Sequence, residues 1–303
     1  EKEKNIMMKA LYSGVSGMRS HQTKMDVIGN NIANVNTNGY KSQRTTFRDV
    51  YYQQLKNPGA ASTDRGGTNP SQVGYGAQVG SVDTIHTISG WAPTNKPTDV
   101  FINGDGYFAV QTSTGEQLYT RLGALGIDSA GNLVDVNGSR VLGWNQKNVS
   151  VDETTGKVTV TGDPESVTIV TQANVEYTNI TINPDGTITA IYNNPSNPED
   201  TQNDKIITLG LVAVANVENQ DALVLEGNSY YRKSNNTGDI NFTIPGSKGS
   251  GTGDLITGAL EMSNVDLANE FSDMIMTQRG FQANTKIISV VDQMLEELVN
   301  LKR

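Results

Sequence analysis

The sequence contains no cysteine and only two histidines, and it carries fewer basic than acidic residues. Without cysteine, the chain forms no disulfide and offers neither a thiolate to a metal nor a thiol nucleophile to a substrate. The 32 Asp and Glu residues outnumber the 23 Lys and Arg residues, which gives a formal net charge of -9. Because nucleic-acid-binding domains are usually basic, this charge argues against a nucleic-acid partner.

Long apolar runs are also missing. No stretch approaches the roughly 18 apolar residues that indicate a membrane-spanning helix, so we expect no membrane span. The longest apolar stretch, residues 206–215, is typical of a buried strand. The first residues lack the apolar segment and cleavage site of a secretory signal, and Met7 or Met8 could be the natural start. We therefore expect no cleaved signal peptide.

No pattern of catalytic or cofactor-binding residues is readable. His21 and His86 stand far apart, and no nucleophile, base and orienting group share a recognisable spacing. Residues 74–80 approach a dinucleotide-binding fingerprint, but the third glycine comes one residue late and β-type sequence follows, which favours a flexible loop. The Asp-rich turns do not follow the EF-hand spacing for calcium. We therefore predict no enzymatic activity, no metal site and no cofactor.

Both ends of the chain carry apolar residues at the helical spacing of three and four. The N-terminal stripe consists of Leu11, Val15, Met18, Met25, Ile28, Ile32 and Val35. The C-terminal stripe consists of Leu267, Phe271, Met274, Phe281, Ile288, Val291, Leu295 and Leu298. This periodicity predicts one amphipathic helix at each end. Gly39 is expected to stop the first helix, and Ser263 or Asn264 to cap the second.

The segment between these helices is rich in Thr, Asn, Gly and Val, with β-type alternation and dense turn signals. We therefore predict a mainly β protein with α-helical termini. The two terminal helices would pair as a coiled-coil-like stalk that carries one discontinuous β domain and a smaller inserted outer β domain. The predicted domains are residues 7–40 with 258–303 for the helical core, 41–145 with 205–257 for the middle β domain, and 146–204 for the outer β domain.

The apolar stripes of the two helices need something to cover them. A lone pair of helices cannot enclose its own stripes, so the ends are expected to fold fully only against neighbouring copies of the chain. The alternative is an intramolecular stalk, or a helical pair packed on the β domain. Periodicity leaves both possibilities open, because it specifies an apolar face without naming what covers it.

Two motifs near the chain ends resemble the signatures of the flagellar rod and hook proteins. Residues 26–41 read Asp-Val-Ile-Gly-Asn-Asn-Ile-Ala-Asn-Val-Asn-Thr-Asn-Gly-Tyr-Lys, which is similar to the N-terminal signature. The segments that are similar to the C-terminal signature are residues 258–267, 274–275, 278–284 and 292–295. Internal segments that also resemble the family are residues 101–108, 119–123, 215–219 and 227–230. Residues 146–204 resemble it least.

Within this family, three features favour a hook subunit over a distal rod subunit. They are the opening at residues 13–17, the form of residues 263–267, and the β-rich insertion after Trp144, which distal rod proteins largely lack. The resemblance implies a non-enzymatic subunit that polymerises into a flexible tube and transmits motor torque in the bacterial flagellum. It also implies export from the cytoplasm through the flagellar type III apparatus. The other implied partners are further copies of the chain, the hook cap, the distal rod and the hook–filament junction proteins.

The resemblance places the polymerisation interface on both chain ends. The expected N-terminal interface residues are Leu11, Val15, Met18, Met25, Ile28, Asn30, Asn31, Ile32, Asn34, Gly39 and Tyr40. The expected C-terminal interface residues are Ser263, Asn264, Val265, Leu267, Phe271, Met274, Gln278, Arg279, Phe281, Asn284, Ile288, Leu295 and Leu298. The asparagines could instead cap the helix end, since Asn side chains compete well for backbone groups.

Two hypotheses of other classes stand beside this one. A secreted β-rich adhesin with a helical stalk would share the same pattern, and ligand binding by a soluble monomer would favour it. A polysaccharide-acting enzyme needs a pair of carboxylates in a cleft, and no spacing in the sequence identifies such a pair.

Overall fold

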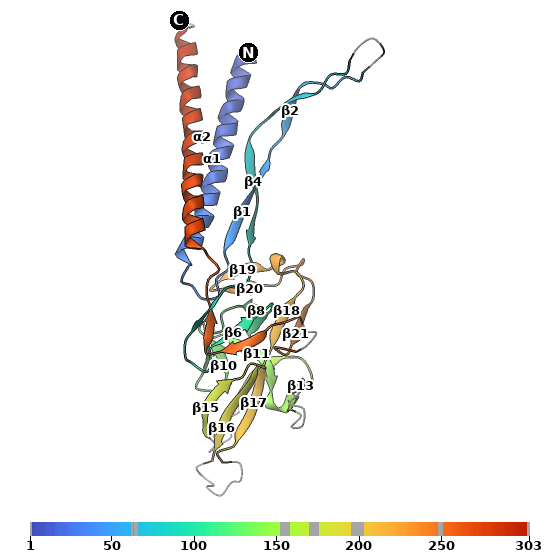
Figure 1. The fold of residues 1–303 in the computed structure, drawn as a ribbon, viewed down its shortest axis with the longest axis vertical. Helices are drawn as coiled ribbons and strands as arrows, with labels where there is room; N and C mark the ends of the chain where they lie inside the picture. The colour runs from blue at the N-terminus through green and yellow to red at the C-terminus, as the bar shows by residue number, and fades with distance from the viewer. Residues whose placement is uncertain are drawn as a thin grey trace. The chain divides into compact units, whose positions relative to one another are not determined.

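The computed structural model describes residues 2–61, 63, 66–151, 158–169, 176–194, 203–247 and 251–301 (Figure 1). The chain divides into two compact units. The helical unit consists of Glu1–Val35, Ser42–Ile85 and Val265–Arg303, and the sheet unit consists of Asn36–Lys41 and His86–Asn264. The chain therefore crosses between the units four times.

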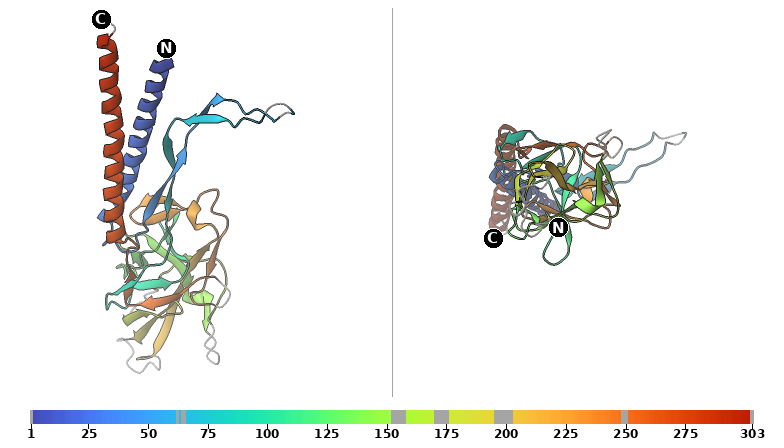
Figure 2. Two further views of the ribbon diagram at one scale, coloured as in Figure 1. Left: turned by 45° about the horizontal axis from the view of Figure 1, so that its top comes forward. Right: turned by 90° about the horizontal axis from the view of Figure 1, so that it is seen from below.

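Helices α1 (Lys2–Ala33) and α2 (Leu267–Leu301) run side by side in the helical unit, as Figures 1 and 2 show in blue and red. The predicted terminal helices are thus confirmed. The predicted N-cap of α2 is wrong, because Oδ1 of Asp266 accepts the bond from the backbone N–H of Ala268 at 2.9 Å. Gly39 has the expected left-handed φ of 70°, but α1 has already ended at Ala33.

A long hairpin completes the helical unit. Strand β1 (Gln43–Asp49) pairs with β4 (Ala77–Thr84), and β2 (Tyr52–Lys56) pairs with β3 (Ser71–Gly74), in both cases antiparallel. The expected flexible loop at residues 74–80 is wrong, because Gly74 pairs with β2, Tyr75 and Gly76 bond to the backbone of residues 50–51, and Ala77 onward pairs with β1. Thr and Val side chains, which favour extended backbone, populate this ladder.

Antiparallel strands build the sheet unit. In the described residues, thirteen strands join one sheet with the main order β15-β16-β17-β11-β7-β8-β20-β19, and β9, β10, β14, β18 and β21 attach beside this path. Smaller pairs are β5 with β23, β6 with β22, and β12 with β13. The bounds are β5 (Trp91–Pro93), β6 (Val100–Asn103), β7 (Tyr107–Gln111), β8 (Gln117–Thr120), β9 (Leu125–Ile127), β10 (Leu133–Asp135), β11 (Arg140–Asn145), β12 (Val149–Val151), β13 (Val158–Val160), β14 (Glu165–Ser166), β15 (Glu176–Ile182), β16 (Thr187–Asn193), β17 (Ile206–Val212), β18 (Val214–Val217), β19 (Val224–Gly227), β20 (Tyr230–Arg232), β21 (Ile240–Thr243), β22 (Asp254–Thr257) and β23 (Ala259–Glu261), with short 3-10 turns η1 (Gln146–Asn148) and η2 (Gln220–Ala222).

The apolar core covers both faces of the central strands. On β7, Tyr107 and Ala109 belong to one buried cluster and Phe108 and Val110 to another, since successive side chains of a strand point to opposite faces. A continuous apolar run of this kind is typical of a strand buried on both sides. The predicted fold class, mainly β with α-helical termini, is confirmed.

The segment predicted as an inserted outer domain takes part in the large sheet. Strand β16 pairs with β15 on one side and with β17 on the other, and β17 continues to β11. Strands β12 and β13 form a pair of their own. The division of the chain into three domains stays a prediction.

Candidate interaction surface of the helical unit

The two helices approach each other closely because small residues of α1 face α2. A Cβ atom at Gly14 would lie 3.2 Å from Cγ1 of Ile288, and one at Gly17 would lie 2.8 Å from Nδ2 of Asn284. Sequence reasoning missed these glycines. The available signal was their spacing of three residues inside a pattern that is otherwise helix-forming.

Burial along the predicted stripes accords with helix pairing inside one chain. Ile28 and Val291 are buried, at 3% and 4% exposed. The half-buried members of the two stripes are Leu11, Val15, Met18, Met25, Ile32, Val35, Met274, Phe281, Ile288 and Leu295. The side chain of Leu298 lies outside the described residues. The intramolecular alternative therefore accounts for a large part of both stripes.

Asn31 joins three elements of the helical unit. Its Nδ2 donates to the carbonyl oxygen of Gln43 on β1 at 2.8 Å and to Oε1 of Glu270 on α2 at 2.9 Å, and its Oδ1 accepts from the Gln43 N–H at 3.0 Å. Burial raises the pKa of the Glu270 carboxyl above its ordinary value. Asn31 therefore has bonding partners within its own chain.

The other polar residues of the predicted interface are spread over both units. Nδ2 of Asn34 donates to the carbonyl oxygen of Asn30 at 2.9 Å, which serves the end of α1 as the capping alternative predicted. Gln278 and Arg279 are exposed on α2, whereas Val265 before it is half-buried. The predicted residues that belong to the sheet unit are Gly39, Tyr40, Ser263 and Asn264.

Helix α2 exposes apolar side chains beyond the predicted stripe. Leu267 and Phe271 of the stripe are 39% and 49% exposed. Further exposed side chains are Ile275, Met276, Ile287, Val290, Met294 and Val299. At 3.6 residues per turn, four of these lie along one side of the helix; the outer flank of α2 is defined as Met276, Ile287, Val290 and Met294.

Apolar residues that stand next to each other in the sequence could have revealed the outer flank. Ile287 precedes Ile288, and Val290 precedes Val291, and neighbouring residues in a helix point in different directions. A helix that is apolar on two sides is usually covered on both. The pairing with α1 covers one side only.

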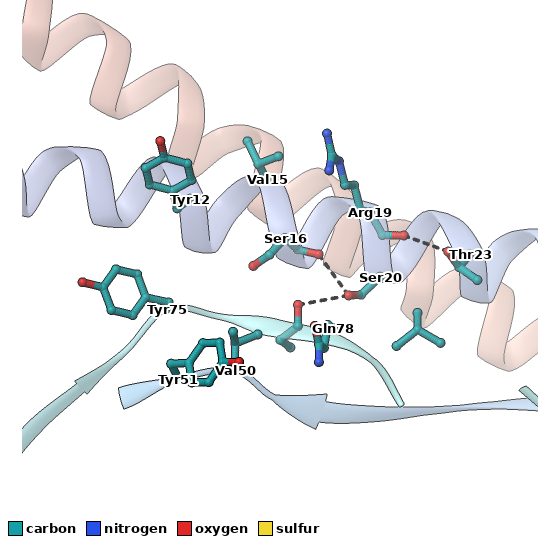
Figure 3. A pocket seen from close by; sticks show the side chains of 12 residues that line it. Tyr12, Val15, Ser16, Arg19, Ser20, Thr23, Val50, Tyr51, Tyr75 and Gln78 are labelled. Atoms are coloured by element: carbon teal, nitrogen blue, oxygen red, sulfur yellow. Dashed lines mark hydrogen bonds between the residues drawn. The ribbon is translucent and has the colours of Figure 1, made fainter. Parts of the chain in front are cut away.

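A groove of about 530 Å³ opens between α1 and the hairpin (Figure 3). It is lined by Tyr12, Val15, Ser16, Arg19, Ser20 and Thr23 of α1, and by Val50, Tyr51, Tyr75, Ala77, Gln78 and Val79 of the hairpin. Oγ of Ser20 donates to the carbonyl oxygen of Ala77 at 3.2 Å and ties the helix to β4. Tyr12 and Tyr51 are 62% and 84% exposed, so the groove presents aromatic surface.

The part of the chain that the structure describes offers neither a metal site nor a membrane-spanning helix. In the described ranges, no group of three or more His, Cys, Asp or Glu side chains is placed to hold a metal ion. No helix in the same part of the chain is long and apolar enough to cross a membrane. His21 lies in the helical unit and His86 in the sheet unit. The features that stand out are apolar surfaces.

Comparison with known proteins identifies the family to which the chain belongs. Family models match residues 11–41 (flagella basal body rod protein), 101–190 (flagellar hook protein FlgE/F/G D1 domain) and 256–301 (flagellar basal body rod FlgEFG protein C-terminal). The chain is 41% identical to the flagellar basal-body rod protein FlgG of Bacillus subtilis, over 98% of this chain and 100% of that protein. The chain belongs to the flagellar rod and hook protein family.

Two relatives from Borreliella burgdorferi represent both branches of the family. The flagellar basal-body rod protein FlgG is 34% identical over 301 aligned residues, and the flagellar hook protein FlgE is 31% identical over 454. Each alignment covers 98% of this chain and 100% of the relative. The expected membership of the rod and hook family is thus confirmed, and the relatives are structural proteins of the flagellum.

The family models bracket the surfaces described above. The N-terminal model spans α1 from Leu11 onward and the turn after it, and the C-terminal model spans the end of β22, all of β23 and α2. The hairpin at residues 42–85 falls between two models. The assignment of individual residues to a polymerisation interface stays a prediction.

Proposed function

We propose that this chain is a subunit of the distal rod of the bacterial flagellum and that it polymerises with copies of itself into a tube. The exposed outer flank of α2 is the observation that supports polymerisation most strongly. Contiguous apolar surface of this kind marks interaction sites on soluble proteins. When the outer flank of one copy contacts a different surface on the next, the interface is heterologous, and such interfaces build open helical assemblies where the rotation between copies does not close a ring.

The choice between rod and hook rests on length. Of the three features behind the hook expectation, the β-rich insertion after Trp144 is the one that concerns length; the other two are the opening at residues 13–17 and the form of residues 263–267. The rod protein of Bacillus subtilis aligns over 297 residues, which is 98% of this chain and the whole of that protein, so it has counterparts for almost every residue here. The Borreliella hook alignment runs over 454 positions, well beyond the 303 residues of this chain. The near-equal lengths of this chain and the Bacillus subtilis rod protein favour the rod assignment.

A hook subunit is the second candidate, because the hook relative also matches 98% of this chain. A tube in the rod or in the hook would adjoin other proteins of the flagellum. The remaining predicted partners are the hook cap, the hook–filament junction proteins and the type III export apparatus. Location outside the cytoplasm without a cleaved signal is part of the same proposal.

The assembly proposal is tested by placing a charge on the outer flank. Val290→Asp should raise the concentration needed for polymerisation about 100-fold or more, equivalent to roughly 2.7 kcal/mol, because the carboxylate would be buried without a partner. Gln293→Asp adds the same charge on another side of α2 and serves as the matched control. Electron microscopy of concentrated protein in precipitant salt provides the measurement. Equal assembly of both variants would contradict the proposal.

The position in the flagellum is tested by labelling. Since the natural sequence lacks cysteine, a single Ser113→Cys variant can carry a gold label at an exposed site of the sheet unit. The variant is expressed in Bacillus subtilis that lacks its own FlgG, and hook–basal bodies are isolated. Gold on the straight rod, with motility restored, is expected. Gold along the curved external hook would overturn the rod assignment in favour of the second candidate.

A further inference from the structure

A fully buried lysine lies in the sheet unit close to the place where the chain leaves it. The side chain of Lys41 is 0% exposed, and its Nζ donates to Oε1 of Glu261 at 2.6 Å and to the carbonyl oxygen of Thr87 at 2.8 Å. Glu261 is itself 1% exposed. Lysine and glutamate are almost never fully buried unless they are paired. This pair joins residues that are 220 positions apart in the sequence.

The residues of this network, Lys41, Thr87 and Glu261, all lie close to crossings between the two units. The chain crosses after residues 35, 41, 85 and 264. Lys41 is the last residue before the second crossing, Thr87 is the second residue after the third, and Glu261 shortly precedes the fourth. The Lys41 ammonium therefore bonds three separate connecting segments to one another inside the sheet unit.

Further hydrogen bonds link the same three segments as the ion pair. The N–H of Gly39 donates to the backbone oxygen of Glu261 at 2.9 Å. Oγ of Ser89 donates to the backbone oxygen of Ser263 at 2.9 Å. Nδ2 of Asn264 donates to Oγ1 of Thr87 at 3.1 Å. The segments at residues 39–41, 87–89 and 261–264 are thus cross-linked several times over a short length of chain.

Arg121 adds a second cation to the buried carboxylate. Its side chain is 0% exposed, Nη1 lies 3.8 Å from Oε2 of Glu261, and the same nitrogen donates to the carbonyl oxygen of Gly104 at 2.8 Å. The guanidinium also stacks over the ring of Tyr107, with its carbon 5.0 Å from the ring centre. Burial lowers the pKa of Lys41 below its ordinary value, and the attraction of Glu261 opposes this shift.

We propose that Lys41 and Glu261 form a mechanical clamp that carries load directly between the two ends of the sheet unit. Tension that enters at residue 36 and leaves at residue 264 passes through the clamp from residues 39–41 to residue 261. The clamp bypasses the long stretch of chain between them, which includes the large sheet. Without the ion pair, the same tension falls on the remaining hydrogen bonds between these segments and on the short β5–β23 and β6–β22 ladders that hold residues 254–261.

The test compares two directions of pulling on the full chain by single-molecule force spectroscopy. The absence of natural cysteine allows handles at Asn36→Cys and Ala268→Cys, which load the clamp, or at Ser113→Cys and Asn235→Cys, which do not; all four sites are exposed. Lys41→Met removes the cross-link but leaves Glu261 beside Arg121, so one carboxylate still faces one cation. The matched control is Lys96→Met, which removes the half-exposed ion pair with Asp99 in the same unit.

At fixed force across residues 36 and 268, Lys41→Met should shorten the lifetime of the folded state on the order of 100-fold, as expected for losing charge-assisted hydrogen bonds. Across residues 113 and 235, the lifetime should change little, and Lys96→Met should change neither. Unchanged lifetime across residues 36 and 268 would refute the clamp. Equal shortening of the lifetime in both pulling directions would show that Lys41 only stabilises the fold. This result would also refute the clamp.

A milder variant keeps the test decisive if Lys41→Met does not fold. Ser89→Ala removes one of the further hydrogen bonds, and it should shorten the 36–268 lifetime by about 10-fold or less. For this variant too, an equal shortening across residues 113 and 235 would refute the clamp. The clamp is measured on the isolated chain, so its failure would leave the proposed place in the flagellar rod untouched.

Discussion

The helical unit and the sheet unit treat large apolar side chains in opposite ways. Phe108 in the sheet unit is 0% exposed, whereas Phe271 on α2 is 49% exposed. The sheet unit buries the apolar side chains of its central strands on both faces. The helical unit buries one seam and leaves the outer flank of α2 uncovered. The difference teaches that one chain can combine strands buried on both faces with a helix that leaves apolar side chains exposed.

The largest expected effect compares these two phenylalanines directly. Phe108→Ala should lower the free energy of unfolding by about 3–5 kcal/mol, because it leaves a cavity in the core. Phe271→Ala should change the stability of the isolated chain by less than about 0.5 kcal/mol, as expected for an exposed position. Urea unfolding is followed by tryptophan fluorescence for the sheet unit, which contains both tryptophans, and by the helical circular dichroism signal for the helical unit, which contains Phe271. Similar losses for the two variants would erase the contrast between the units.

Two glycines of α1 sharpen the comparison at the helix seam. Gly14→Leu should destabilise the helix pair by about 1–3 kcal/mol, since its side chain meets Ile288. Gly29 has no atom within 4 Å of a Cβ position among the described residues. Gly29→Leu should therefore stabilise the helix by about 0.5–1 kcal/mol through its higher helix propensity. Thermal melting of the helical circular dichroism signal is the measurement, and loss of stability in both variants would argue against a close seam.

A histidine of the sheet unit gives a smaller effect that depends on pH. Burial lowers the pKa of His86 to about 4, and the unfolded chain has the ordinary value near 6.5. Between these values the unfolded chain binds a proton that the folded chain does not, so stability falls as the pH falls. The slope is at most about 1.4 kcal/mol per pH unit, and partial exposure of the ring reduces it.

The groups that face His86 are Tyr107, whose hydroxyl lies 2.8 Å from Nδ1, and the ring of Tyr231, with charges at Asp221, Lys41 and Arg121. His86→Gln removes the titration. It should flatten the dependence of the urea midpoint on pH between 6.5 and 4. A slope identical to that of the unmodified chain would show that other groups cause it.

The sequence predicted those parts of the fold that follow from local periodicity. The terminal helices carry apolar residues every three or four positions, and the strands around Phe108 carry continuous apolar runs. The hairpin at residues 42–85 escaped prediction because β2 and β3 are exposed throughout and so lack the alternation of a half-buried strand. The cap at Asp266 was missed because Ser263 and Asn264, equally good capping residues, stand just before it.

The surfaces and the clamp were less predictable for a different reason. A helix pattern identifies apolar faces, but which face α1 covers depends on close contacts such as that of Gly14 with Ile288. The pairing of Lys41 with Glu261 depends on a fold that brings together residues 220 positions apart. Lys41 was recognised only as the end of a family motif, and no local rule assigns a partner to a single lysine.

The smallest expected effect concerns an ion pair of the helical unit. Nζ of Lys24 lies 3.0 Å from Oδ2 of Asp273, with the side chains 25% and 43% exposed. Pairs exposed to this degree contribute about 0.2–1 kcal/mol, and salt weakens them. A double-mutant cycle with Lys24→Met and Asp273→Ala, measured by helix melting at low and high salt, should therefore give a small coupling that falls as salt increases.

The same cycle on the buried pair Lys41 and Glu261 should give a larger coupling that depends little on salt, because water and ions do not reach it. A large, salt-resistant coupling between Lys24 and Asp273 would mean that the seam is drier than its exposed fractions indicate. Both units would then contain an ion pair that is shielded from water, and they would differ only in the apolar surface that α2 leaves exposed.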